Sequence, residues 1–230
     1  MIWLFASACI CFAVIAAFLL ARRLAAKARH HPLLNPILFA AALVGLGLWF
    51  SGLSLPLFAD LTYPLRWLLG PAIVALGLRI WESRAAIRRT ALPLLVAITI
   101  GSLTGITSGV GLARLLHLDV SLVTALAPKS VTSPFAIALM ERLGGSPELA
   151  AGLVIVTGII GAILLPPLLR LLRLDDPETL GVSLGQAAHI VGTDALARRS
   201  AKAAAFSGIA MVLAGLATSL LLPLLWPRLF

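Results

Sequence analysis

A lysine, three hydroxyl residues and two prolines interrupt a long apolar run between residues 126 and 139, LAPKSVTSPFAIAL. An unpaired lysine within the hydrocarbon of a membrane costs roughly 2.5–3.5 kcal/mol. Lys129 is therefore expected to face the protein interior or a wet cavity and to have a partner of opposite charge. Of the nine acidic residues, only Asp194 falls plausibly within an apolar segment. An anionic ligand is thus an economical partner for Lys129.

The prolines beside Lys129 predict a broken helix whose second half begins at the same place. Pro128 would end one half-helix, and Ser133 followed by Pro134 has the pattern of an N-cap residue and first helical residue. Free N–H groups and the positive end of the helix dipole would then lie close to the ammonium group. The alternative is a lysine that reaches the membrane surface, with the prolines forming only a kink. Hydroxyl donors in this stretch are Ser130, Thr132 and Ser133.

A second polar interruption, GVSLGQAAHIVGTDALA, covers residues 181–197 and contains His189, Gly192 and Thr193. A histidine at membrane depth can donate a hydrogen bond to a carboxylate, relay a proton or pair with a backbone carbonyl. The sequence leaves the functional and structural roles of His189 equally open. For Asp194, a local salt bridge with Arg198 on the same helical face is favoured over a chemical role.

A third interruption, Gly70-Pro71, indicates either a broken helix that supports the site or a plain kink. The chain has no nucleophile and base arrangement, no phosphate-cradling loop and no HExxH pattern. We therefore expect neither an enzyme nor catalytic residues. We also expect no metal and no cofactor, because the histidines have no metal-ligand spacing: His30, His31, His117 and His189.

The composition is that of a membrane protein, with 60% hydrophobic residues, 12% charged residues and a mean hydropathy of +1.06 over 230 residues. The net charge of +9 comes from basic residues between the apolar segments, where they orient a chain against the cytoplasmic leaflet. Nucleic-acid binding is not expected. Cys9 and Cys11 lie two residues apart within one apolar segment, which predicts no disulfide framework.

The hydropathy pattern predicts an all-α polytopic membrane protein of about eight apolar segments, with broken or re-entrant helices near 69–72, 127–134 and 185–194. Short loops leave no room for a soluble domain, so residues 1–230 are expected to form one membrane domain. A faint similarity between residues 69–72 and 184–187 suggests transporter-like internal repeats. The expected segments are 2–21, 36–55, 65–81, 91–116, 120–140, 148–171, 179–197 and 203–226.

The distribution of basic residues predicts the orientation of these segments. If all eight cross, 12 lysines and arginines lie on one side and five on the other, which places both termini outside. If the seventh segment is re-entrant, the distribution becomes 9 to 8, so the rule favours a full crossing. Segment 2–21 lacks a preceding positive region and is expected to be a retained helix.

These motifs resemble the LrgB/CidB family of bacterial membrane proteins. The resemblance covers about residues 31–225 and rests above all on PKSVT at 128–132 and HIVGT at 189–193, with LLGPAIVALG at 68–77. The chain departs from the family pattern at Ser133-Pro134-Phe135, at Ala188 and at Asp194. These departures bear on ligand preference more than on architecture.

The resemblance implies one of two activities in the bacterial inner membrane. The first is transport of small monocarboxylates such as glycolate, glycerate and pyruvate, with possible proton coupling through His189. The second is antiholin-like control of murein hydrolase activity and autolysis, together with a small LrgA/CidA-like membrane partner. A homo-oligomer is also expected. Broken helices bearing Lys129 and His189 favour transport, whereas a pore-forming channel ranks third because no selectivity-filter pattern is present.

In the transport hypothesis, the substrate carboxylate contacts Lys129 and the half-helix that begins near Ser133. The seventh segment would complete the site. The predicted binding residues are Lys129, Ser130, Thr132, Ser133, His189, Gly192 and Thr193, and the predicted supporting residues are Gly70, Pro71, Pro128 and Pro134.

Overall fold

The computed structural model describes residues 2–27, 36–68, 70–71, 74–75, 78, 81, 84–197 and 199–230. All regular elements within these ranges are helices, as the composition predicts. Contacts divide the chain into two compact units, Met1–Ala72 and Ile73–Phe230. The organisation as one membrane domain stays a prediction.

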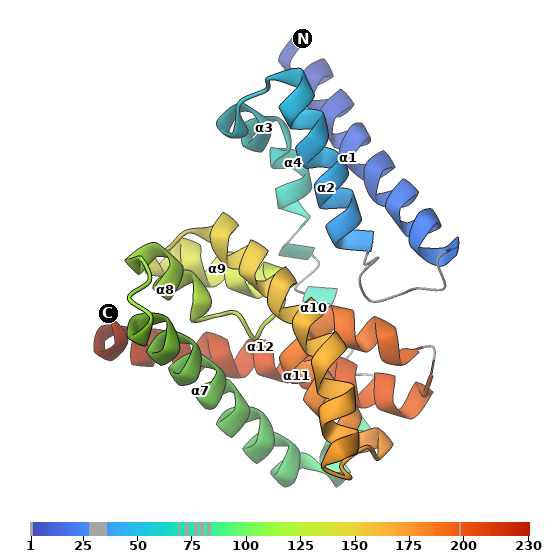
Figure 1. The fold of residues 1–230 in the computed structure, drawn as a ribbon, viewed down its shortest axis with the longest axis vertical. Helices are drawn as coiled ribbons and strands as arrows, with labels where there is room; N and C mark the ends of the chain where they lie inside the picture. The colour runs from blue at the N-terminus through green and yellow to red at the C-terminus, as the bar shows by residue number, and fades with distance from the viewer. Residues whose placement is uncertain are drawn as a thin grey trace. The chain divides into compact units, whose positions relative to one another are not determined.

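The first unit is a helical hairpin whose second arm is bent. Helices α1 and α2 pack antiparallel (Figure 1). Gly52 ends α2 with a φ of +65°, a conformation that glycine adopts without a Cβ clash. The chain then turns by 119° into α3. The helices of this unit are α1 (Ile2–Lys27), α2 (Pro36–Ser51), α3 (Leu55–Leu61) and α4 (Tyr63–Trp67).

Polar side chains of α1 bind the end of α3. The Ser7 hydroxyl donates a hydrogen bond to the Leu61 carbonyl at 2.6 Å, and the Cys11 thiol lies 3.6 Å from the same oxygen. The last carbonyls of a helix lack intrahelical donors. Ser7 and Cys11 therefore supply donors to a helix end that packs among apolar side chains, and both cysteines of the chain are free.

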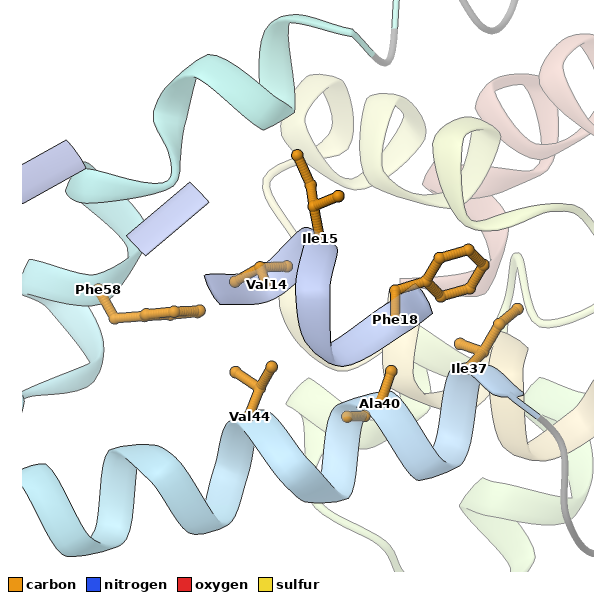
Figure 2. Close-up of a pocket in the computed structure, with 8 residues that line it drawn as sticks. Val14, Ile15, Phe18, Ile37, Ala40, Val44 and Phe58 are labelled. Atoms are coloured by element: carbon orange, nitrogen blue, oxygen red, sulfur yellow. The ribbon is translucent and has the colours of Figure 1, made fainter. Parts of the chain in front are cut away.

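An apolar groove runs between α1, α2 and α3 (Figure 2). Figure 2 shows Phe18 and Ile37 toward one end and Phe58 at the other. The side chains that line it offer no charge and no hydrogen-bond donor, so the groove has no means of binding a small anion. They are Val14, Ile15, Phe18, Ile37, Ala40, Ala41, Val44 and Phe58.

The second unit is a bundle in which α12 contacts several other helices. It packs most extensively against α11 and also touches α7 and α9. Arg114 near the end of α7 donates to the Leu229 carbonyl and stacks on the Phe230 ring, which ties α7 to the end of α12. The helices are α6 (Arg84–Arg89), α7 (Ala91–Leu115), α8 (Val120–Leu126), α9 (Ser133–Leu143), α10 (Pro147–Leu171), α11 (Pro177–Ala197) and α12 (Ala201–Leu229).

Four helices in the described part of the chain are long and apolar enough to cross a membrane, and the bent pair of α2 and α3 makes up to five. Eight crossings are not confirmed. A hydrocarbon core of about 30 Å requires about 20 helical residues, whereas α8 has 7 and α9 has 11. Seven of the 17 residues in the predicted segment 65–81 lie outside the described residues. The four spans are Trp3–Lys27, Ala91–Leu115, Pro147–Leu171 and Ala201–Leu229.

Candidate functional site

The break predicted near residues 127–134 is confirmed: α8 ends at Leu126, and α9 begins at Ser133. Pro128 is buried in the intervening turns. Tight turns satisfy part of this backbone, because the N–H groups of Lys129 and Val131 bond the carbonyls three residues earlier. The break is therefore an ordered feature of the bundle.

The prediction that Ser133 caps α9 is wrong by one residue. Thr132 is the N-cap, with extended φ and ψ of −78° and 153°, and its carbonyl accepts the first helical bond from Ala136. Ser133 is already helical, so Pro134 occupies the second helical position. The Thr132 side chain makes no capping hydrogen bond, so the first N–H groups of α9 stay available to an anion.

Lys129 reaches from the break to α7. Its Nζ donates to the Gly105 carbonyl at 2.9 Å and lies 3.5 Å from the Ser130 hydroxyl. A Cβ on Gly109 would lie 3.0 Å from Cε of Lys129, so the absence of a side chain there makes room for the lysine. Within the described ranges, no carboxylate forms a salt bridge with Lys129. The half-buried ammonium is held by neutral oxygen atoms.

The break predicted near residues 185–194 is also confirmed. His189 interrupts α11 with φ 46° and ψ −127°, a left-handed conformation that is uncommon for a residue with a side chain. The residue is only 2% exposed. Two glycines of α10 make room for the break. A Cβ on Gly158 would lie 3.3 Å from His189 Nδ1, and one on Gly161 would lie 3.0 Å from the Ala187 carbonyl oxygen.

The two breaks lie close together, because the His189 imidazole is near the main chain of Lys129, although 60 residues separate them in sequence. Two buried side-chain polar atoms in the described residues have no hydrogen-bond partner, and each belongs to one break: Thr132 Oγ1 and His189 Nε2. Buried polar groups are normally paired. Together with Lys129, they are the polar groups of the two breaks that could bind a small anion.

The other predicted residues either lie beside Lys129, Thr132 and His189 or make contacts that support the helices. Ser130 lies against Gly105, where a Cβ would be 3.0 Å from its hydroxyl. The Thr193 hydroxyl already has two hydrogen-bond partners, the His189 carbonyl and the Ser207 hydroxyl. Gly192 is buried within α11 and relieves crowding with Leu184 and Ala188.

Gly70 and Pro71 belong to the first unit. Their supporting role, and the internal repeat predicted around them, stay predictions. Asp194 is exposed. Its predicted partner, Arg198, lies outside the described residues.

A glycine stripe on α7 was missed by the sequence reasoning. Gly101, Gly105 and Gly109 recur every four residues and so share one helical face. Gly105 and Gly109 receive Ser130 and Lys129, and Gly101 receives Gln186 of α11. The Gln186 amide donates to the Ile98 carbonyl at 2.8 Å. The regular spacing GxxxGxxxG was the available signal for close packing.

Within the described part of the chain, no group of three or more histidine, cysteine, aspartate or glutamate side chains is arranged to hold a metal ion. The candidate site comprises the Lys129 ammonium, the His189 imidazole, the Thr132 hydroxyl and the N-terminus of α9.

A family model described as LrgB-like matches residues 14–227, which is nearly the whole chain. The protein belongs to the LrgB-like family. It is 32% identical over 158 residues to YwbG of Bacillus subtilis, covering 69% of this chain and 70% of that protein. The antiholin-like protein LrgB of the same organism is 26% identical over 210 residues, covering 91% and 90% of the two chains.

A third relative is the plastidal glycolate/glycerate translocator 1 of Arabidopsis thaliana. It is 30% identical over 154 residues, which cover 66% of this chain and 30% of the translocator. No solved structure matches the chain. The comparisons confirm the family resemblance, and with the apolar helices they establish a multi-pass membrane protein.

Proposed function

We propose that this protein is a secondary transporter of small monocarboxylates of the glycolate, glycerate and pyruvate class. The observation that carries this proposal is the pair of unpartnered buried atoms, Thr132 Oγ1 and His189 Nε2, one at each of two broken helices. Transporters place substrate sites at such discontinuous helices. The similarity to a plastidal glycolate/glycerate translocator supports the substrate class.

The chemistry of each group fits a carboxylate. Lys129 supplies the positive charge, and the uncapped N-terminus of α9 supplies N–H donors and the positive end of a helix dipole. Thr132 Oγ1 and His189 Nε2 are free to bond the bound anion. His189, whose imidazole can take up and release a proton, is also the residue proposed to couple transport to protons.

The proposal includes a location and a topology. The protein would lie in the bacterial inner membrane with both termini outside, as the basic residues predict. Eight crossings would require the interrupted segments 65–81, 120–140 and 179–197 to traverse the membrane with their breaks. A homo-oligomer without enzymatic activity completes the proposal.

Uptake by purified protein in proteoliposomes tests the transport hypothesis. We expect saturable uptake of labelled glycolate or pyruvate by the wild type and loss of uptake in Lys129→Met. The matched control is Lys202→Met, which removes an exposed lysine paired with Glu178 at 2.7 Å and should retain uptake. Normal uptake by correctly inserted Lys129→Met protein would refute the proposed site.

A second candidate function is antiholin-like regulation of murein hydrolase activity and autolysis. Relatives named holin-like CidB and antiholin-like LrgB favour it. In this case the protein would act with a small LrgA/CidA-like membrane partner. Absence of uptake by folded wild-type protein, and its appearance after co-reconstitution with that partner, would indicate a two-component carrier. Absence in both preparations would favour the regulator.

A further inference from the structure

Ser207 of α12 touches α11 on both sides of the break at His189. Its side chain is fully buried. Before the break, Gly185 packs against the Ser207 backbone so closely that a Cβ on the glycine would lie 2.2 Å from the Ser207 carbonyl oxygen. After the break, the Ser207 hydroxyl lies 2.8 Å from Thr193 Oγ1. One residue of α12 thus contacts both halves of the broken helix.

The hydrogen bonds at this point have a defined direction. The Thr193 hydroxyl lies 2.7 Å from the His189 carbonyl oxygen, which can only accept. A hydroxyl carries one proton, so Thr193 donates that proton to His189 and must accept from Ser207. The result is a relay in which Ser207 donates to Thr193 and Thr193 donates to the backbone of His189.

The backbone of His189 needs such support. Its φ of 46° with ψ of −127° lies in a region that residues with a Cβ rarely occupy, and such conformations persist where the surroundings over-determine them. The absence of a side chain at Gly158 of α10 makes room for the ring. The relay holds the carbonyl through the hydrogen bond from Thr193. The direction of the ring, and hence of Nε2, depends on this backbone.

We propose that Ser207 and Thr193 are positioning residues that aim the His189 imidazole at the candidate anion site. The inference deepens the proposed function and rests on it for its effect on substrate. Its structural part, the orientation of His189 by α12, stands on contacts of the apo chain and is measurable without transport.

The test compares Ser207→Ala, Thr193→Val and Thr193→Ser. The matched control is Ser219→Ala, because Ser219 lies on the same helix and its hydroxyl bonds that helix's own backbone, at the Gly215 carbonyl. In detergent-solubilised protein with 15N-labelled histidine, the His189 signal is assigned by its loss in His189→Gln. We expect Ser207→Ala and Thr193→Val to shift that signal, whereas Thr193→Ser and Ser219→Ala leave it in place.

In proteoliposomes, the same two variants should raise KM for glycolate about fivefold, the factor of one typical hydrogen bond, with kcat little changed. Thr193→Ser should restore the wild-type KM. An unchanged His189 signal in folded Ser207→Ala and Thr193→Val would overturn the proposal. If the wild type shows no uptake but the signal shifts as expected, the transport hypothesis fails while the positioning role is supported.

Discussion

The contact between α11 and α12 at Gly185 allows a stability prediction worked from the structure. A Cβ at Gly185 would lie 2.2 Å from the Ser207 carbonyl oxygen, whereas ordinary contact begins near 3.4 Å. Replacing Gly185 with alanine would therefore require a local separation of about 1.2 Å, the difference between these distances. Neither group can rotate away, because one is a Cβ and the other belongs to the backbone.

Overpacking of this kind costs typically about 1–3 kcal/mol. Alanine regains about 1 kcal/mol through its better helix propensity, so Gly185→Ala is expected to destabilise the protein by up to about 2 kcal/mol. Gly208→Ala is the matched control. A Cβ at Gly208 meets no atom within 4 Å, so that variant should be stabilised by up to about 1 kcal/mol.

Thermal unfolding in detergent, followed by tryptophan fluorescence, measures both variants. The melting temperature should fall below the wild-type value for Gly185→Ala and equal or exceed it for Gly208→Ala. A Gly185→Ala protein that melts at or above the wild-type temperature would refute the close backbone packing from which the prediction is worked.

Thr132→Val removes a buried hydroxyl without a partner. It should raise stability by about 1 kcal/mol while weakening carboxylate uptake; a lower melting temperature would show that the hydroxyl is bonded after all. The Thr179 side chain and backbone N–H beside Asp176 lower the pKa of its carboxyl below the ordinary 3.8. The stabilising effect of the charged Asp176 carboxylate is thus present above pH 3.8 and lost on acidification. The melting temperature of Asp176→Asn should therefore depend less on pH below about pH 4 than that of the wild type.

Both central breaks could be predicted from sequence because their causes are local. Pro128 lacks the N–H that would continue the helical hydrogen bonds, and glycines and a histidine interrupt an apolar run near residue 189. The N-cap of α9 was misplaced by one residue because helix ends depend on backbone angles as well as residue preference. The number of crossings was less accessible, since hydropathy windows do not distinguish a crossing helix from two short ones.

The glycine stripe of α7 shows why packing partners were harder to find. Its four-residue spacing is visible in sequence, but the side chains that fill it come from two distant segments. Gln186 arrives from α11, and Lys129 arrives from the turn before α9. Ser207 was likewise missed, because a serine in an apolar helix carries no local sign of what it contacts.

The sequence by itself determined the membrane environment of the chain, its helical class, its family and the residue types available for binding an anion. These follow from composition and local pattern, since each apolar run must satisfy its own backbone in hydrocarbon. Only the tertiary structure decided that Lys129 bonds α7, that His189 meets the Lys129 main chain, and that Thr132 Oγ1 and His189 Nε2 are left without partners. Such pairings arise from helix packing across long sequence separations, which no local pattern encodes.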